Sequence, residues 1–159
     1  MDDLDARYPI TIDPITSASE TKLTASDGST SDAFGYSVSG AGDIDGDGYN
    51  DIIVGSIGDS DGGSYAGAAY VYYGSASGID ASSEDKIIAS DADTYGRLGY
   101  SVSDAGDIDG DGYDDVIVGA YGDDDNGSYA GAAYIYYGSS SGLDTASEDK
   151  LTASDGANN

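Results

Sequence analysis

Two acidic segments of the sequence have the composition of cation-binding loops. Segment 43–51, DIDGDGYND, carries carboxylates at its first, third, fifth and ninth positions. Segment 107–115, DIDGDGYDD, repeats this arrangement 64 residues further along the chain. Crowded carboxylates repel one another unless a cation compensates their charge. An ordinary acidic turn is the alternative, but it does not explain why the same costly arrangement occurs twice.

The spacing of the acidic residues indicates calcium. A hard cation of this kind takes six to eight oxygen ligands, and alternate positions of a tight loop can converge on it. The intervening glycines allow the backbone conformations that such a loop requires. We predict two Ca²⁺ ions per chain, one in each loop. The expected ligands are Asp43, Asp45, Asp47, the carbonyl of Tyr49 and Asp51 in the first loop, and Asp107, Asp109, Asp111, the carbonyl of Tyr113 and Asp115 in the second.

The remaining composition excludes several other chemistries. The chain has no Cys and no His, so it has no thiolate metal site, no disulfide and no histidine base. Its 31 acidic and 5 basic residues give a net charge of -26, which repels nucleic acid and anionic membranes. An EF-hand is excluded because the twelfth position of each loop is valine, Val54 or Val118, where that motif needs a bidentate Glu.

An internal repeat must position the two loops. Residues 28–91 and 92–155 are identical at 44 of 64 aligned positions. The segment ETKLTASD at 20–27 is a further copy of the segments at 84–91 and 148–155. We therefore divide the chain into a lead-in segment 1–19, an extra outer strand 20–27, a first repeat unit 28–91, a second repeat unit 92–155 and a tail 156–159.

Each repeat unit predicts four short strands, at 34–39, 51–56, 68–73 and 86–90 in the first unit. Turns rich in Gly and Asp separate them, and no stretch has a sustained helical period. The second and third strands are apolar on both faces, as expected of sheets that are covered on both sides. This pattern predicts an all-β chain of two four-stranded antiparallel β-propeller blades. A two-sheet sandwich is the alternative, and its outer faces should be polar.

The segments FGYSVSGAGDIDGDGYNDIIVGS and GAAYVYYG resemble the FG-GAP repeat, the blade unit of the integrin α-subunit β-propeller, and the resemblance covers roughly residues 20–155. It implies a propeller blade with calcium in the first hairpin loop, and an extracellular or cell-surface location. The first nine residues have none of the features of a signal peptide. Two departures affect the motif: Leu98 replaces its aromatic residue in the second copy, and Ala69 and Ala133 replace its proline.

These features predict a non-catalytic calcium-binding module that adheres to, or binds, an extracellular protein or glycan, without nucleic-acid binding or membrane insertion. Two alternatives stay open. One is a purely structural, self-assembling or engineered propeller fragment without a ligand. The other is a hydrolase domain that uses paired carboxylates.

Two further groups of residues allow more than one interpretation. The pairs Asp59/Asp61 and Asp123/Asp125 lie in turns between the second and third strands of each unit. They are either exposed solubilising turns, which we favour, or further cation-binding loops. The tyrosine clusters are either core, which we favour, or a sugar-binding surface.

Two blades leave two apolar faces uncovered, and repeat units of this kind are rarely stable alone. Head-to-tail contacts between copies form a ring if the rotation closes. We therefore predict a homo-oligomer of three or four chains, which would complete a six- or eight-bladed ring. The extra outer strand at 20–27 would then compete with its other copies for a place in the ring.

Overall fold

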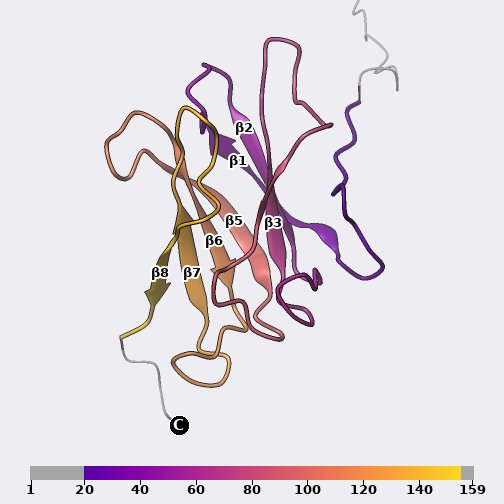
Figure 1. Cartoon of the computed structure of the whole chain (residues 1–159), viewed down its shortest axis with the longest axis vertical. Helices are drawn as coiled ribbons and strands as arrows, with labels where there is room; N and C mark the ends of the chain where they lie inside the picture. The colour runs from indigo at the N-terminus through magenta and orange to yellow at the C-terminus, as the bar shows by residue number, and fades with distance from the viewer. Residues whose placement is uncertain (1–19, 155–159) are drawn as a thin grey trace, which may run out of the picture.

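Figure 1 shows the computed structural model of the chain, in which residues 20–154 are described. The predicted lead-in segment 1–19 and tail 156–159 lie outside the described residues. Within residues 20–154 the chain forms eight strands and no helix, which confirms the all-β prediction. That part of the chain accordingly contains no helix with the length and hydropathy needed to cross a membrane.

The strands form two four-stranded antiparallel sheets, each in simple sequence order, which confirms the predicted pair of blades. Blade 1 contains β1 (Phe34–Gly42), β2 (Asp51–Ser56), β3 (Ala68–Tyr72) and β4 (Asp85–Ile87). Blade 2 contains β5 (Leu98–Gly106), β6 (Asp115–Ala120), β7 (Ala132–Tyr136) and β8 (Asp149–Thr152). The first strand of each blade runs further than predicted, to the edge of the acidic loop, and the fourth strand is shorter.

The central strands are apolar on both sides because each side of the sheet faces a different apolar layer. Ile53 pairs with Val71, and both belong to the core that lies between the two blades. Val54 pairs with Tyr70 on the opposite face, where they join a second, smaller core with Phe34. The alternation of strand side chains therefore supplies two cores from one sheet.

The two blades approach closely through their backbones. Ser37 Oγ on β1 donates a hydrogen bond of 2.7 Å to the carbonyl of Gly99 on β5. Gly55 on β2 lies against the same carbonyl, and a Cβ built at Gly55 would be 2.1 Å from the oxygen. Only glycine allows this approach, so the contact between the blades depends on Gly55.

The predicted extra outer strand at 20–27 does not form a strand in the structure. Leu23 and Ala25 instead pack against the smaller core on the face of blade 1 that lies away from blade 2. Its copies β4 and β8 already fill the place of the fourth strand, since β3 pairs with β4 and β7 pairs with β8. Segment 20–27 therefore covers blade 1 as a packed lead-in.

The opposite face of blade 2 has no such cover among the described residues. Leu151 on β8 is 49% exposed, whereas Ile87, its counterpart on β4, is 0% exposed because blade 2 packs over it. The stack of two blades thus ends in an open apolar face.

Candidate metal centre

The first acidic loop brings three of its predicted ligands together. It connects β1 to β2, and the carboxylates of Asp43, Asp45 and Asp47 each offer an oxygen within 4.8 Å of the other two. Asp43 Oδ1 is buried and has no hydrogen-bond partner among the described residues. A buried carboxylate oxygen without a donor carries a large desolvation penalty. A cation bound between these side chains would remove that penalty.

Short backbone turns orient the carboxylates of this loop. The N–H of Asp47 donates to Asp45 over 3.1 Å, and the N–H of Tyr49 donates to Asp47 over 2.9 Å. Gly48 donates to Asp43 Oδ2 over 2.9 Å, and its φ of 90° lies in the region that favours glycine. Each carboxylate is thus fixed through one oxygen, so other lone pairs remain for a ligand.

Asp51, the fifth predicted ligand, lies apart from this triad of carboxylates. It is buried, and its two oxygens accept 2.8 Å hydrogen bonds from the N–H groups of Ile44 and Gly74. It therefore ties the start of the loop to the end of β3. Burial is the main cause that raises the pKa of Asp51, against the two hydrogen bonds, and the charges of Asp45 and Asp43 add to the rise.

In the second acidic loop, between β5 and β6, carboxylates from a different set of loop positions come together. Asp107, Asp109 and Asp115 offer oxygens within 4.8 Å of one another, while Asp111 is not in this group. Asp115 is buried and accepts hydrogen bonds from Ile108 and Gly138, as Asp51 does from its counterparts. The aspartate at the ninth position therefore holds the loop by hydrogen bonds to its backbone in both blades. In blade 2 this aspartate also belongs to the carboxylate cluster.

The mutual repulsion of the second cluster is visible in its electrostatics. Desolvation is the first cause that raises the pKa of Asp109, and the charges of Asp111, Asp115 and Asp107 raise it further. The seventh residue, Tyr113, donates its N–H to Asp111 over 3.0 Å, as Tyr49 does to Asp47 in the first loop. Both loops therefore have the oxygen-rich, negatively charged donor set that suits a hard cation.

A reciprocal pair of hydrogen bonds joins the first loop to blade 2. The N–H of Asp43 donates to Asp114 Oδ2 over 2.8 Å, and the N–H of Asp114 donates to the carbonyl of Asp43 over 3.1 Å. Asp114 is the eighth residue of the second loop. The two acidic loops are consequently coupled across the blade contact.

In the turns that contain Asp59/Asp61 and Asp123/Asp125, a lysine side chain of the same chain supplies the positive charge. Lys86 on β4 places its Nζ 2.6 Å from Asp27, 2.9 Å from Asp59 and 2.7 Å from Asp61. The hydroxyl of Tyr70 lies 2.9 Å from both Asp27 and Asp59. In blade 2 the same cluster consists of Lys150, Asp91, Asp123, Asp125 and Tyr134.

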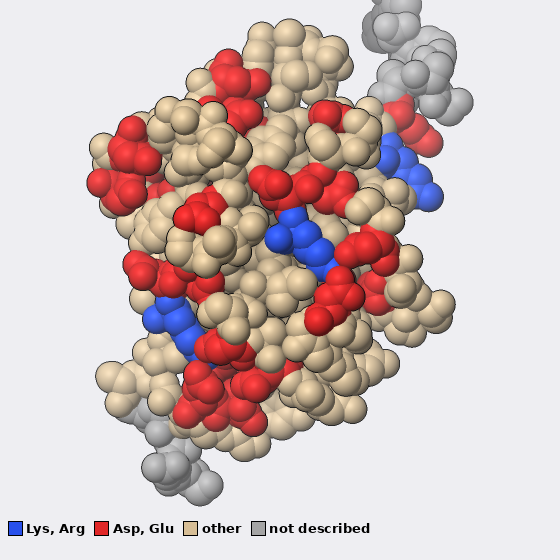
Figure 2. All heavy atoms as spheres, viewed as in Figure 1, with Lys and Arg blue, Asp and Glu red and all other residues tan. Residues whose placement is uncertain are grey.

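We call these two groups the lysine clusters. Sequence reasoning favoured exposed turns here, but Asp59 and Asp123 are buried. The missed signal was the lysine that recurs at the same place in both repeats, at residues 86 and 150. Figure 2 shows the few Lys and Arg residues of the visible face, in blue, set among red Asp and Glu residues.

Two sets of tyrosines that the sequence did not separate lie at opposite extremes of exposure. The core contains Tyr70, Tyr72, Tyr134 and Tyr136, so the interpretation of the tyrosine clusters as packing residues is confirmed for these residues of β3 and β7. A second set is 39–63% exposed and consists of Tyr36, Tyr49, Tyr65, Tyr95, Tyr100, Tyr121 and Tyr129. The exposed tyrosines are available for contacts with a partner.

Comparison with known proteins identifies both repeats. The family model described as the FG-GAP repeat matches residues 18–72 and 81–136. Residues 43–51 fall in the first match and residues 107–115 in the second, so each acidic loop belongs to one copy of the repeat.

Integrin alpha chains are among the similar curated proteins. Integrin alpha pat-2 of Caenorhabditis briggsae is 41% identical over 90 residues, which is 55% of this chain and 7% of that protein. Human integrin alpha-IIb is 40% identical over 89 residues, which is 56% of this chain and 8% of that protein. Integrin alpha-PS5 of Drosophila melanogaster is 39% identical over 123 residues, covering 76% and 11% of the two chains. The chain thus spans about a tenth or less of the length of these relatives.

Proposed function

The chain belongs to the FG-GAP repeat family, and on that premise we propose that it is a non-catalytic, calcium-binding β-propeller module that binds an extracellular partner. The observation that carries the proposal is the convergence of Asp43, Asp45 and Asp47 around a buried oxygen without a donor. Repetition of the loop in blade 2 gives two calcium sites per chain. Adhesion at the cell surface is the role that the likeness to integrin alpha chains suggests.

Calcium would act on the blades rather than on a substrate. It would be held by Asp43, Asp45 and Asp47 in the first loop and mainly by Asp107, Asp109 and Asp115 in the second. Bound charge there would offset the repulsion within each loop. The cross-blade bonds of Asp43 would then hold the two hairpins in a fixed relation. The connections at the other end of the sheets would be presented as a rigid ligand-binding surface.

A calcium titration by calorimetry tests the proposal. Two sites of extracellular strength, with Kd on the order of 10⁻⁴ to 10⁻³ M, are expected. Asp45→Ala and Asp109→Ala should each remove one site, whereas Asp80→Ala, at an exposed aspartate outside both loops, should remove neither. Two sites that persist in the double variant of Asp45 and Asp109 would contradict the assignment.

We also propose that copies of the chain stack head to tail. Residues with which blade 1 contacts blade 2 have counterparts on the open side of blade 2. The Ser37 donor has its counterpart in Ser101, and the glycine at 55 has its counterpart in Gly119. Leu151 supplies an exposed apolar side chain where Ile87 is buried. Another copy of blade 1 therefore fits this face with contacts that the molecule already uses once.

A stack of three or four chains would give a ring of six or eight blades, which closes if the rotation between chains allows it. In that ring, residues 148–155 of one chain would meet residues 20–27 of the next, and the two are copies of one segment. One of the two segments must then be displaced. Light scattering on calcium-loaded protein tests the stack, because a monodisperse particle of 16.0 kDa at micromolar concentration would contradict it.

A further inference from the structure

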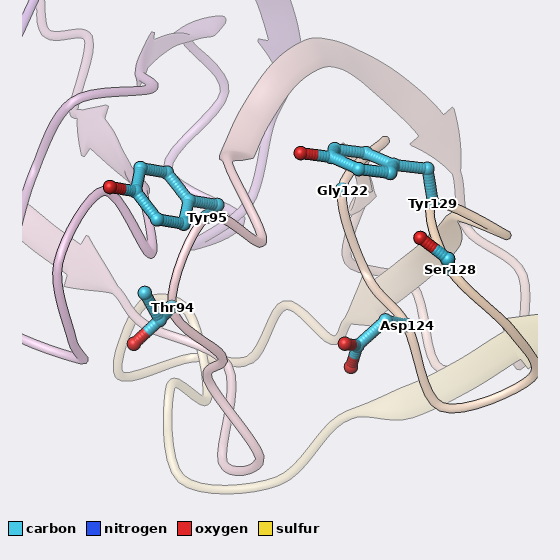
Figure 3. Close-up of a pocket in the computed structure, with 6 residues that line it drawn as sticks. All are labelled: Thr94, Tyr95, Gly122, Asp124, Ser128 and Tyr129. Atoms are coloured by element: carbon cyan, nitrogen blue, oxygen red, sulfur yellow. The ribbon is translucent and has the colours of Figure 1, made fainter.

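A cavity of about 170 Å³ opens in blade 2 at the end of the sheet opposite the acidic loops. It lies between the β4–β5 connection and the β6–β7 connection, and Figure 3 shows its side chains. Six residues line it: Thr94, Tyr95, Gly122, Asp124, Ser128 and Tyr129. The cavity is separate from the candidate metal centre and is the size of a site for one small ring, well below the roughly 300–1,000 Å³ of drug-sized pockets.

Two tyrosine rings flank the hollow. Tyr95 stacks on Tyr65 of blade 1, with ring centroids 5.6 Å apart and planes 11° from parallel. Tyr129 is 63% exposed. Both tyrosines have a positive φ, 66° at Tyr95 and 56° at Tyr129, which is uncommon for a bulky side chain. Tyr95 is itself 47% exposed, so both side chains present apolar surface with a polar tip to solvent.

The polar lining suits a ligand with several hydroxyl groups. Figure 3 shows the Asp124 carboxylate and the Ser128 hydroxyl on the same side of the cavity as Tyr129, with Thr94 below Tyr95. Hydroxyl side chains both donate and accept hydrogen bonds. A carboxylate accepts strong, short bonds from hydroxyl or ammonium groups.

Asp124 is the carboxylate of the cavity lining, and further negative charge lies beside it. Asp93, Asp124 and Asp125 offer oxygens within 4.8 Å of one another. Lys150 pairs with Asp125 at 2.7 Å, but within residues 20–154 no lysine or arginine forms an ion pair with the other two. Desolvation, followed by the charge of Asp124, raises the pKa of Asp93. A ligand with a positive charge would relieve this repulsion, and an acidic sugar would add to it.

Blade 1 shows which of these features are specific additions. At two aligned lining positions it has Ser31 in place of Tyr95 and Ser60 in place of Asp124, and the other four lining positions are identical in the two blades. Beside the lining, Ser29 stands in place of Asp93. Ser31 also has a positive φ, 79°, so the loop geometry belongs to the repeat. The aromatic ring and the carboxylates are what blade 2 adds to it.

We propose that this cavity binds a sugar ring that carries a protonated amino group, such as a hexosamine unit of a glycan. The ring faces of Tyr95 and Tyr129 contact the C–H face of the sugar. Thr94 and Ser128 exchange hydrogen bonds with its hydroxyls, and Asp124 accepts from the ammonium group. This inference rests on the proposed ligand-binding function and names the class of ligand.

The test compares D-glucosamine, D-glucose and ethylammonium as probes of the whole chain, by calorimetry and by NMR of the tyrosine rings. D-glucosamine should bind at least about ten-fold more tightly than either of the others, because only it satisfies both the rings and the carboxylates. The double variant Tyr95→Ser and Asp124→Ser gives the cavity the lining of blade 1 and should bind it at least about ten-fold more weakly. Asp104→Gly is the charge-matched control, since blade 1 has Gly40 there, and it should bind as the parent does.

Three results would overturn the inference. Equal binding of ethylammonium would make the cavity a general cation site, and equal binding of D-glucose would remove the role of the charge. Unchanged binding in the double variant would show that the net charge of -26 attracts the probe without a defined site. Failure of calcium to bind would be seen separately, because calorimetry with Ca²⁺ reports on the loops at the other end of the sheets.

Discussion

Two isoleucines with the same neighbours in sequence have opposite environments in the two blades. Ile44 is 0% exposed in the core between the blades, whereas Ile108 is 49% exposed on the far face of blade 2. The N–H groups of both donate over 2.8 Å to the ninth aspartate of their loop, so the two loops fold alike. Place in the stack, and not local sequence, decides which isoleucine is buried. Each repeat therefore carries one half of a contact that needs a neighbouring blade.

The largest expected effect is on stability, and it comes from replacing the buried isoleucine of this pair. Ile44→Ala should lower the free energy of unfolding by about 2–5 kcal/mol, because it opens a cavity in the core between the blades. Ile108→Ala in dilute, monomeric protein should change it by no more than about 0.5 kcal/mol, because the side chain is exposed. Urea unfolding of both variants measures the difference.

The same pair also tests the stacking of chains. In assembled protein, Ile108→Ala should weaken association, since Ile108 would then take the place that Ile44 has between blades 1 and 2. If Ile108→Ala costs as much as Ile44→Ala in the monomer, the far face of blade 2 is not open, and the comparison fails.

The lysine clusters should respond equally in the two blades, in contrast to the isoleucines. Lys86→Met leaves Asp27, Asp59 and Asp61 together without a cation, and should cost about 2–3 kcal/mol. This lies below the range for a fully buried pair, because two of the carboxylates are partly exposed to solvent. Lys150→Met should cost about the same, since each cluster relies mainly on its own blade. Urea unfolding measures both variants, and a cost limited to one of them would contradict the equivalence.

Acid unfolding provides the control for that assignment. The hydrogen bond from Lys86 is the first cause that lowers the pKa of Asp27 below its usual value. The stabilisation from this carboxylate is therefore present above its unfolded pKa, and is lost as the pH falls through the lower folded pKa. Lys86→Met should flatten this part of the curve of stability against pH, between the ordinary aspartate pKa and the lower folded one.

The features that the sequence predicted are those that recur at a fixed period. Four strands per unit and an acidic loop between the first two follow from local pattern and from the repeat itself. The lysine clusters could not be predicted in the same way, because Asp27, Asp59 and Lys86 are far apart in sequence and meet only in the folded blade. Segment 20–27 does not form a strand in the single chain for a related reason. Its sequence is that of an outer strand, but β4 and β8 already take the places beside β3 and β7.

Each calcium site should contribute less than Ile44→Ala or Lys86→Met costs, and calcium sharpens the comparison of the two loops. A ligand present at about ten times its Kd stabilises the native state by roughly 1.4 kcal/mol per site. Chelator should lower the melting temperature more than an ionic-strength-matched salt does. Asp45→Ala and Asp109→Ala should each remove about half of that difference. Identical melting curves with chelator and with matched salt would contradict calcium binding in both blades.

The smallest expected effect concerns the charge that blade 2 alone has beside its cavity. Asp124→Ser should lower the pKa of Asp93 towards its usual value, because the carboxylate of Asp124 is one of the causes that raise it. A raised folded pKa means that Asp93 favours folding only while it is protonated, and this contribution is lost as the pH rises through the unfolded pKa to the folded one. The variant should therefore be slightly more stable than the parent at neutral pH, by a few tenths of a kcal/mol.

Titration of Asp93 by NMR measures the shift, and added salt should reduce the difference between the parent and the variant. Asp124→Asn, which removes the charge but keeps the shape, should shift the pKa in the same direction. If neither variant moves it, desolvation alone sets the pKa of Asp93, and the carboxylates beside the cavity do not repel each other enough to favour a cationic ligand.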